Sequence, residues 1–229
     1  MESTRPLVAA VHATPATIRP VNEAYADDFP AADVWHLLDD RLVKDADRAG
    51  CRTPELALRM RTLIRYALDA GADAVQLCCS MYGPVAAQVA ADVPVISSDQ
   101  AMFDEVVALA PRHVRVLASL APAAEDSRAR LGKALEEAGR SCPVGSVVVA
   151  GAAAAASTQD LETLRAVMTE AARSLDASVD VIAFAQYSLA PVASAVAAAV
   201  AATVVTGPHL AASTMAGLLD GTPERGGRP

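Results

Sequence analysis

The sequence predicts an α/β protein built from two pseudo-symmetric, flavodoxin-like lobes, each with a parallel β-sheet flanked by helices. Short apolar runs rich in Val, Ile and Ala alternate with helical segments, which is typical of strands buried on both faces and joined by right-handed crossovers. The two halves of the chain also repeat. The segment DAVQLCCSMYGPVAA from Asp73 is similar to DVIAFAQYSLAPVAS from Asp180, and the spacing between these two segments also relates Pro15 to Pro122.

The first half shows alternating strand and helix signals. The helix that follows Thr53 has the clearest of them, because Thr53 is a favourable N-cap, Pro54 suits the first helical turn and Gly71 follows its expected end. We expect, in order, strand 7–13, helix 21–29, a strand or turn at 33–39, helix 54–70, strand 73–79, helix 84–91, strand 94–98 and a helix capped by Asp99 that ends near residue 108.

The second half repeats this order. We expect strand 114–120, helix 125–138, strand 145–151, helix 158–175, strand 180–186, an Ala-rich helix, strand 203–207 and a last helix. The first lobe should comprise residues 1–110 and the second residues 111–220, with the last helix, at about 208–220, able to pack on the first lobe. Residues 221–229 are rich in Gly, Pro and Arg and are predicted to be a disordered tail.

Composition and charge exclude several classes of function. The net charge of −8 argues against a nucleic-acid partner, because no cluster of Lys and Arg offsets it. The longest apolar stretch, residues 190–205, is interrupted by Ser194 and runs from one strand signal to the next, so we expect no membrane span. The four cysteines form no CxxC pair and no zinc spacing, and no signal peptide is recognisable. We therefore expect a cytoplasmic protein without a metal site.

Polar side chains follow the predicted strands where each strand ends. In parallel α/β sheets ligands collect at the carboxyl ends of the strands, and the N-termini of the following helices hold carboxylates well. We therefore expect a small carboxylate substrate to bind in the cleft between the lobes. The candidate residues at these strand ends are His12, Thr14, Cys79, Ser80, Met81, Ser98, Ser119, Gln186, Tyr187, Ser188 and Thr206.

On these residues the chain resembles the aspartate/glutamate racemase superfamily, which includes glutamate, aspartate and hydantoin racemases, maleate isomerase and arylmalonate decarboxylase. GADAVQLCCS stands in the place of a family strand that ends in Cys-Asn-Thr or Cys-Ser. DVIAFAQYS stands in the place of the strand that ends in Gly-Cys-Thr. The resemblance covers nearly the whole chain, to about Leu219, and it implies a cofactor-independent enzyme with its site between the lobes.

The resemblance also implies a mechanism from which this sequence departs. In members with both cysteines, one thiolate removes a proton from the carbon next to a carboxylate and the opposite thiol returns one from the other face. Here Cys79 matches the first position, and a helix N-terminus after it predicts a lowered pKa. Gln186 stands in the second position, where its amide cannot exchange a proton but can donate to a ligand. Cys78 faces the other side of the strand and is expected in the core.

Three functions remain open. The first is an isomerase or related lyase that uses Cys79 alone, either as a nucleophile, as the resemblance to maleate isomerase implies, or as a proton donor to an enolate, as the resemblance to the decarboxylase implies. The second is a racemase or epimerase whose other base is His209 or His12. The third is a carboxylate-binding protein on the same scaffold without turnover. We favour an isomerase that needs no cofactor, and we expect a homodimer or higher homo-oligomer.

Overall fold

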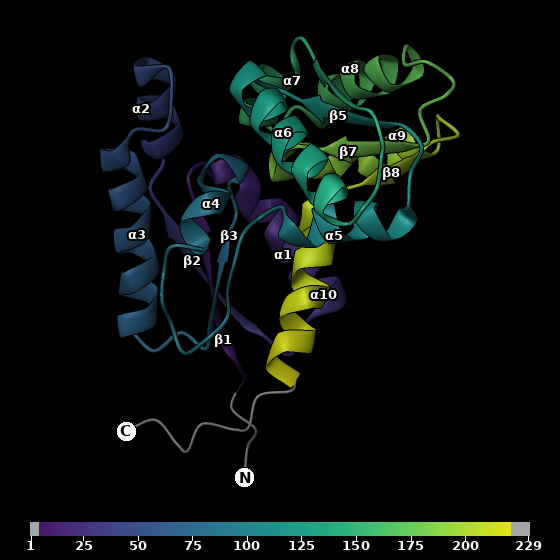
Figure 1. The fold of residues 1–229 in the computed structure, drawn as a ribbon. Coiled ribbons are helices and arrows are strands. Elements are labelled where there is room, and N and C mark those ends of the chain that lie inside the picture. Colours follow the sequence, from purple (N-terminus) through teal and green to yellow (C-terminus); the bar gives the residue numbers. More distant parts are fainter. Residues whose placement is uncertain (1–4, 221–229) are drawn as a thin grey trace.

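The computed structural model describes residues 5–220 as two α/β lobes that meet at one junction (Figure 1). In this part of the chain each lobe holds one four-stranded parallel sheet, of order β2-β1-β3-β4 in the first and β6-β5-β7-β8 in the second. The two orders are equivalent, because the offset from Asp73 to Asp180 also separates the starts of β1 and β5 and the starts of β3 and β7; this confirms the predicted fold class. The strands are β1 (Leu7–His12), β2 (Asp33–Leu38), β3 (Ala74–Leu77), β4 (Val95–Ile96), β5 (Val114–Ala118), β6 (Val144–Val148), β7 (Val181–Phe184) and β8 (Thr203–Val205).

Helices follow the strands throughout the described chain. The α-helices are α1 (Ile18–Asp28), α2 (Leu42–Ala49), α3 (Pro54–Asp69), α4 (Gly83–Ala86), α5 (Gln100–Leu109), α6 (Ala121–Glu137), α7 (Ala152–Thr158), α8 (Leu161–Arg173), α9 (Ala193–Ala197) and α10 (Gly207–Asp220). Three 3₁₀ turns, η1 (Pro15–Thr17), η2 (Ser80–Tyr82) and η3 (Tyr187–Val192), follow the carboxyl ends of β1, β3 and β7. Helix α3 begins as predicted, since the Thr53 side chain accepts a hydrogen bond from the Leu56 N–H.

Several predicted elements differ from the structure. Helix α2 was not predicted; it packs through the buried Leu42 and Ala46 and carries surface ion pairs such as Lys44 with Asp40. It ends before Gly50, whose φ of 71° is in the left-handed region. The predicted helix 158–175 is α8, and a separate helix that was not predicted, α7, precedes it; α7 ends where Gln159 adopts a left-handed φ of 57°. A 3₁₀ turn precedes the helix after β3 and the helix after β7, and the first of these, α4, ends at Ala86 rather than near residue 91. Helix α6 begins earlier than expected, at Ala121.

The two lobes exchange a helix. Helix α5 comes from the first half of the sequence but packs on the second sheet, where Met102, Phe103 and Val106 join the core formed by β5, β7 and β8. Helix α10 comes from the second half and packs beside α1 on the first sheet, where Ala211 and Met215 are buried (Figure 1). Each lobe therefore completes its core with a helix from the other half of the chain.

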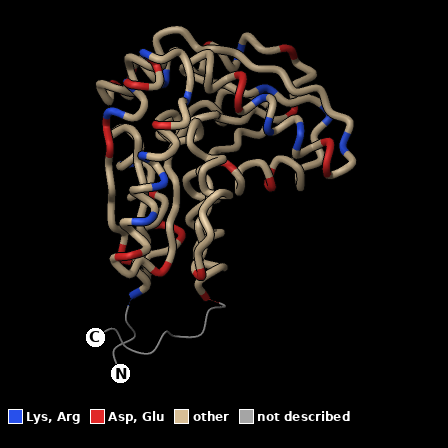
Figure 2. The backbone as a smooth tube through the Cα atoms, turned by 60° about the vertical axis from the view of Figure 1, so that its left-hand side comes forward, with Lys and Arg blue, Asp and Glu red and all other residues tan. Residues whose placement is uncertain are grey.

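Charged residues of both signs are spread over both lobes (Figure 2). No described helix is long and apolar enough to cross a membrane. The predicted disordered tail, residues 221–229, lies outside the described residues.

Candidate active site

The lobe junction is built from the segments that follow strand carboxyl ends. Turn η2, after β3, contacts the start of α6, after β5, and turn η1, after β1, contacts η3 and α7 of the second lobe. This is the edge at which parallel sheets place ligands. The structure therefore brings the segments that carry most of the predicted site residues to one interface.

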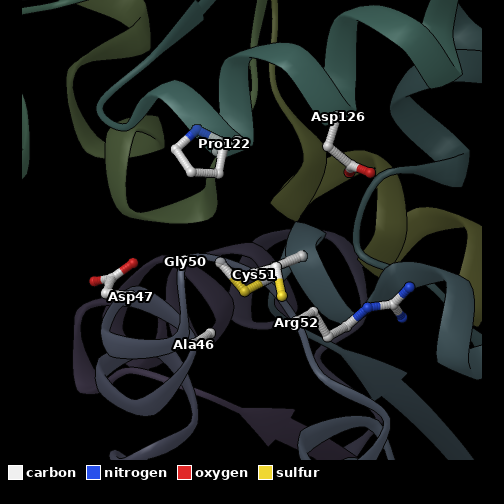
Figure 3. Close-up of a pocket in the computed structure, with 9 residues that line it drawn as sticks. Ala46, Asp47, Gly50, Cys51, Arg52, Pro122 and Asp126 are labelled. Carbon is white, nitrogen blue, oxygen red and sulfur yellow. The ribbon is translucent and has the colours of Figure 1, made fainter.

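One side of the junction holds a cavity of about 400 Å³ (Figure 3). Figure 3 shows Pro122 and Asp126 of α6 on one wall and Asp47, Cys51 and Arg52 on the opposite wall, from α2 and the segment before α3. The remaining lining residues are Ala46, Gly50, Met81 and Ala123. Of the residues predicted for the site, Met81 contributes to this lining.

The other side of the junction holds a much smaller cavity at the pseudo-symmetric position. At the offset of the sequence repeat, Met81 of the large cavity corresponds to Ser188 of the small one, and Arg52 corresponds to Gln159. The small cavity has a volume of only about 20 Å³. Its lining residues are Ala16, Arg19, Pro20, Ala156, Gln159, Leu161, Leu164, Ser188 and Pro191. The repeat thus gives two equivalent positions, of which one is open and the other nearly closed.

Cys79 ends β3 directly before η2 and is half-buried, whereas Cys78 is in the core, as predicted. Burial raises the pKa of the Cys79 thiol to about 11, because the thiolate would lose its hydration. The N–H groups of Met81 and Tyr82 lower this pKa, but by less than burial raises it, and the carboxylates of Asp99 and Asp126 raise it further. The expected low pKa is therefore wrong for this structure, and the thiol is protonated at neutral pH.

Gln186 ends β7 and is fixed by its own lobe. Its Oε1 accepts hydrogen bonds from the N–H and the hydroxyl of Ser119, at 2.8 Å and 3.1 Å. With Oε1 occupied, the amide NH₂ is the part of the side chain left to donate to a ligand. That Gln186 and Cys79 face each other across the junction stays a prediction.

Arg52 lines the large cavity and was not singled out in the sequence. Its Nη1 is buried and has no hydrogen-bond partner in the described part of the chain. A buried guanidinium nitrogen without an acceptor is costly, so a ligand carboxylate at this place would be favoured. The sequence signal was weak because Arg52 lies between α2, which was not predicted, and the cap of α3.

Tyr187 and Ser98 lie under the junction. Tyr187 is buried in the core of the first lobe, and its hydroxyl accepts a hydrogen bond of 3.0 Å from Gln76, which in turn accepts one of 2.6 Å from Tyr25. Ser98 is buried, and its hydroxyl has no partner within residues 5–220. Gly207 is required here, since an added Cβ would lie 2.7 Å from the Ser98 carbonyl oxygen and would also collide with the Tyr187 ring. Tyr187 follows β7 of the second lobe but packs in the core of the first, so its side chain links the two lobes.

His12 is fully buried, and both of its ring nitrogens are engaged inside the first lobe. Nδ1 lies 2.7 Å from the Thr17 hydroxyl and Nε2 lies 2.9 Å from His36 Nδ1, while His36 Nε2 contacts Asn22 at 2.8 Å. Burial, with a smaller contribution from His36, lowers the pKa of His12 to about 3. This imidazole is therefore neutral and hydrogen-bonded, with no nitrogen free for a ligand.

The other predicted residues are spread around the junction. His209, near the start of α10, is exposed and pairs with Asp28 at the end of α1, 2.6 Å away, and it lines neither cavity. Ser80 is buried in η2, and Thr14 caps η1 by accepting from the Ala16 N–H. Thr206 is half-buried between β8 and α10.

Several solved structures are similar to this fold. A glutamate racemase from Bacillus anthracis has a TM-score of 0.74 at 13% identity, over 95% of this chain and 83% of that one. An aspartate racemase from Picrophilus torridus has a TM-score of 0.67 at 10% identity, over 92% of each chain. An allantoin racemase from Pseudomonas fluorescens has a TM-score of 0.64 at 14% identity, over 93% of this chain and 91% of that one. Comparison of the sequence with family profiles and with curated proteins finds no match.

Fold and junction together define a two-lobed α/β protein whose parallel sheets direct their carboxyl ends to a shared interface. The likeness extends over nearly the full length of the described chain. The chain shares the two-lobed fold of these glutamate, aspartate and allantoin racemases, which is the fold that the sequence resemblance implied.

Proposed function

We propose that the protein is a cofactor-independent isomerase or related lyase that acts on a small carboxylate at the lobe junction, with Cys79 as its single reacting thiol. The asymmetry of the two pseudo-symmetric cavities carries this proposal. The cavity of about 400 Å³ is lined by Met81, two residues after Cys79, whereas the cavity of about 20 Å³ is lined by Ser188, two residues after Gln186. The larger cavity therefore lies beside the turn that follows Cys79, and the nearly closed one lies beside the turn that follows Gln186.

The state of Cys79 favours a role as proton donor. A thiol whose burial raises its pKa to about 11 holds its proton at neutral pH and can deliver it to the carbon of an enolate that forms when a substrate loses CO₂. This leaves a thiolate stabilised by the N–H groups of Met81 and Tyr82, which then takes up a proton from water. Gln186 would bind the substrate through its NH₂ group. The alternative of a histidine as second base has less support, because His12 has both nitrogens engaged and His209 is exposed and pairs with Asp28. A carboxylate-binding protein without turnover is the other alternative, and the isotope experiment below separates it.

Arg52 is the residue we expect to hold the substrate carboxylate. Arg52→Gln should raise the Kd of a bound carboxylate by about 10- to 100-fold, since a hydrogen bond to a charged group contributes about 1.5–3 kcal/mol. Titration calorimetry with aspartate, glutamate, maleate and malonate as probes measures this. Arg48→Gln is the matched control, because Arg48 is an exposed arginine of the adjacent helix α2 that pairs with Asp45. If a probe binds to Arg52→Gln and to the wild type with equal Kd, Arg52 does not hold the carboxylate.

A second experiment addresses the missing thiol. In D₂O, the wild type should not exchange the α-proton of either enantiomer of aspartate or glutamate by a two-thiol route, whereas Gln186→Cys should show slow exchange by NMR. The gain is expected to be small, because a working pair also needs sub-ångström placement. Gln186→Ala is the control, since it loses the same bonds from Ser119 without adding a thiol. Fast exchange by the wild type that survives His12 and His209 substitutions would show that another base acts opposite Cys79. A wild type that binds a probe but neither exchanges nor converts it would favour the binding protein.

A further inference from the structure

Arg130 of α6 reaches across the junction to the turn that follows Cys79. Its Nη2 lies 3.4 Å from the Ser80 carbonyl oxygen, in η2 of the first lobe. The same nitrogen donates to the carboxylates of Asp99 and Asp126, and the guanidinium carbon lies 5.2 Å from the centre of the Phe103 ring. Arg130 is thus held on several sides, with its side chain only 24% exposed.

Asp99 is the buried partner of this arginine. Its side chain is 3% exposed, and it does not cap α5 as the sequence suggested. Ser97 takes that place, since its oxygen accepts from the Gln100 N–H while its hydroxyl donates to Asp99 at 3.1 Å. A Cβ added at Gly83 would lie 3.0 Å from Asp99 Oδ1, so this carboxylate packs directly against the end of η2. A carboxylate this deeply buried requires its cation.

We propose that Arg130 is a positioning residue that fixes the Cys79 turn from the opposite lobe, through the Ser80 carbonyl and the buried Asp99. The inference rests on the proposed function only in taking Cys79 as the reacting thiol. A residue of the second lobe, Arg130, thereby fixes the position of the Cys79 turn, which belongs to the first lobe. Within each lobe alone, the turn would lack this contact.

The electrostatics of the Cys79 thiol agree with this geometry. The titratable groups whose charges act on it or that respond to it are Cys78, Tyr82, Asp99 and Asp126. Asp99 and Asp126 raise the pKa of Cys79, and both are paired with Arg130. Loss of the Arg130 charge therefore leaves two carboxylates uncompensated and raises this pKa further, while loss of the Asp126 charge lowers it.

The test is hydrogen–deuterium exchange, read by mass spectrometry on the full chain, for wild type, Arg130→Gln, Arg130→Lys and Arg128→Gln. In Arg130→Gln the amides of residues 80–83 should exchange about tenfold faster or more, while those of β5 and β7 stay unchanged. Arg130→Lys should restore part of the protection. Arg128→Gln is the control, because Arg128 lies on the same helix and pairs with Glu125 within that helix. Unchanged protection of residues 80–83 in folded Arg130→Gln overturns the proposal.

A double variant keeps the test valid if Arg130→Gln does not fold. Arg130→Gln with Asp99→Asn removes both buried charges, so no buried carboxylate is left unpaired; Asp126 also loses its cation, but its side chain is 41% exposed. The hydrogen bond to the Ser80 carbonyl is still lost. Faster exchange confined to residues 80–83 supports the proposal, and protection equal to wild type contradicts it. A second readout is the pH dependence of Cys79 alkylation by iodoacetamide, whose midpoint should rise in Arg130→Gln and fall in Asp126→Asn. Neither measurement requires turnover, so the inference can fail or stand independently of the proposed isomerase activity.

Discussion

Replacing Cys79 with alanine is expected to reduce turnover of a small carboxylate by about 10²- to 10⁴-fold, the usual contribution of a positioned acid or base. Folding should be preserved, because the side chain is small and only half-buried at the end of β3. Polarimetry or NMR of the substrate gives the rate, and circular dichroism and the thermal midpoint check the fold. The matched control is Cys78→Ala, which removes the adjacent thiol from the core of the first lobe and should leave the rate within a few-fold.

The pH profile of the same reaction separates two roles of the thiol. With its pKa raised to about 11 by burial, a protonated Cys79 acting as donor gives a rate that is flat from neutral pH upward and falls only as the pH passes 11. A nucleophilic thiolate instead gives a rate that rises about tenfold per pH unit up to that value. If Cys79→Ala keeps the wild-type rate, the reacting group must be sought elsewhere in the junction.

Acidification is expected to destabilise the fold through His12. The pKa of His12 is lowered to about 3 in the folded protein, whereas in the unfolded chain it lies near 6.5, so below pH 6.5 the unfolded state binds a proton that the folded state does not. Stability contributed by neutral His12 is complete above pH 6.5 and is lost progressively between 6.5 and about 3. The slope is about 1.4 kcal/mol per pH unit, or about 2 kcal/mol between pH 6.5 and 5. Burial lowers the pKa of His36 as well, which adds in the same direction.

Urea unfolding of the wild type and of His12→Asn at pH 7 and pH 5 measures this effect. His12→Asn should be less stable than the wild type at pH 7, because it loses packing and two ring hydrogen bonds. Between pH 7 and pH 5 its free energy of unfolding should fall less than that of the wild type, because the variant lacks the group that takes up one proton on unfolding. His113→Asn is the control, since His113 is a partly exposed histidine of the second lobe whose Nδ1 contacts the Ser178 hydroxyl. A pH slope in His12→Asn as steep as in the wild type would falsify the assignment.

The repeat is what made the fold predictable from sequence. One constant spacing, that between Asp73 and Asp180, relates strands, turns and prolines together, so the two sheets and their matching orders followed from it. The Thr53 cap was also predicted correctly, because it acts within one helical turn, whereas Asp99, the other expected cap, turns its carboxylate to Arg130 instead. Helix α2 was missed because its ion pairs, such as Lys44 with Asp40, occur in a segment that otherwise reads as a charged loop.

The site was harder to predict because it depends on contacts between lobes. Strand ends located Cys79 and Gln186, but alternation along a strand does not tell which polar side chains turn inward. Tyr187 was expected at the substrate, and it packs instead into the core of the first lobe. Arg52 and Arg130 carry no motif; they matter because the junction brings Arg52 to the large cavity and Arg130 to Asp99, and such placement is a property of the tertiary structure.

The exchange of α5 and α10 has a consequence for how the chain folds. One face of the first sheet is shared by α1 and α10, and one face of the second is shared by α6 and α5. In a nascent first half, α1 alone covers the face that carries Val8, Ala10 and Ala74, and this cover is completed only when α10, the last described helix, has been made. Such contacts between distant parts of a chain form late, since loop closure must come first. We therefore expect the two lobes to fold as one cooperative unit, like a dimer whose subunits exchange a helix but with both subunits in one chain. The junction can form completely only when synthesis of the chain is nearly finished.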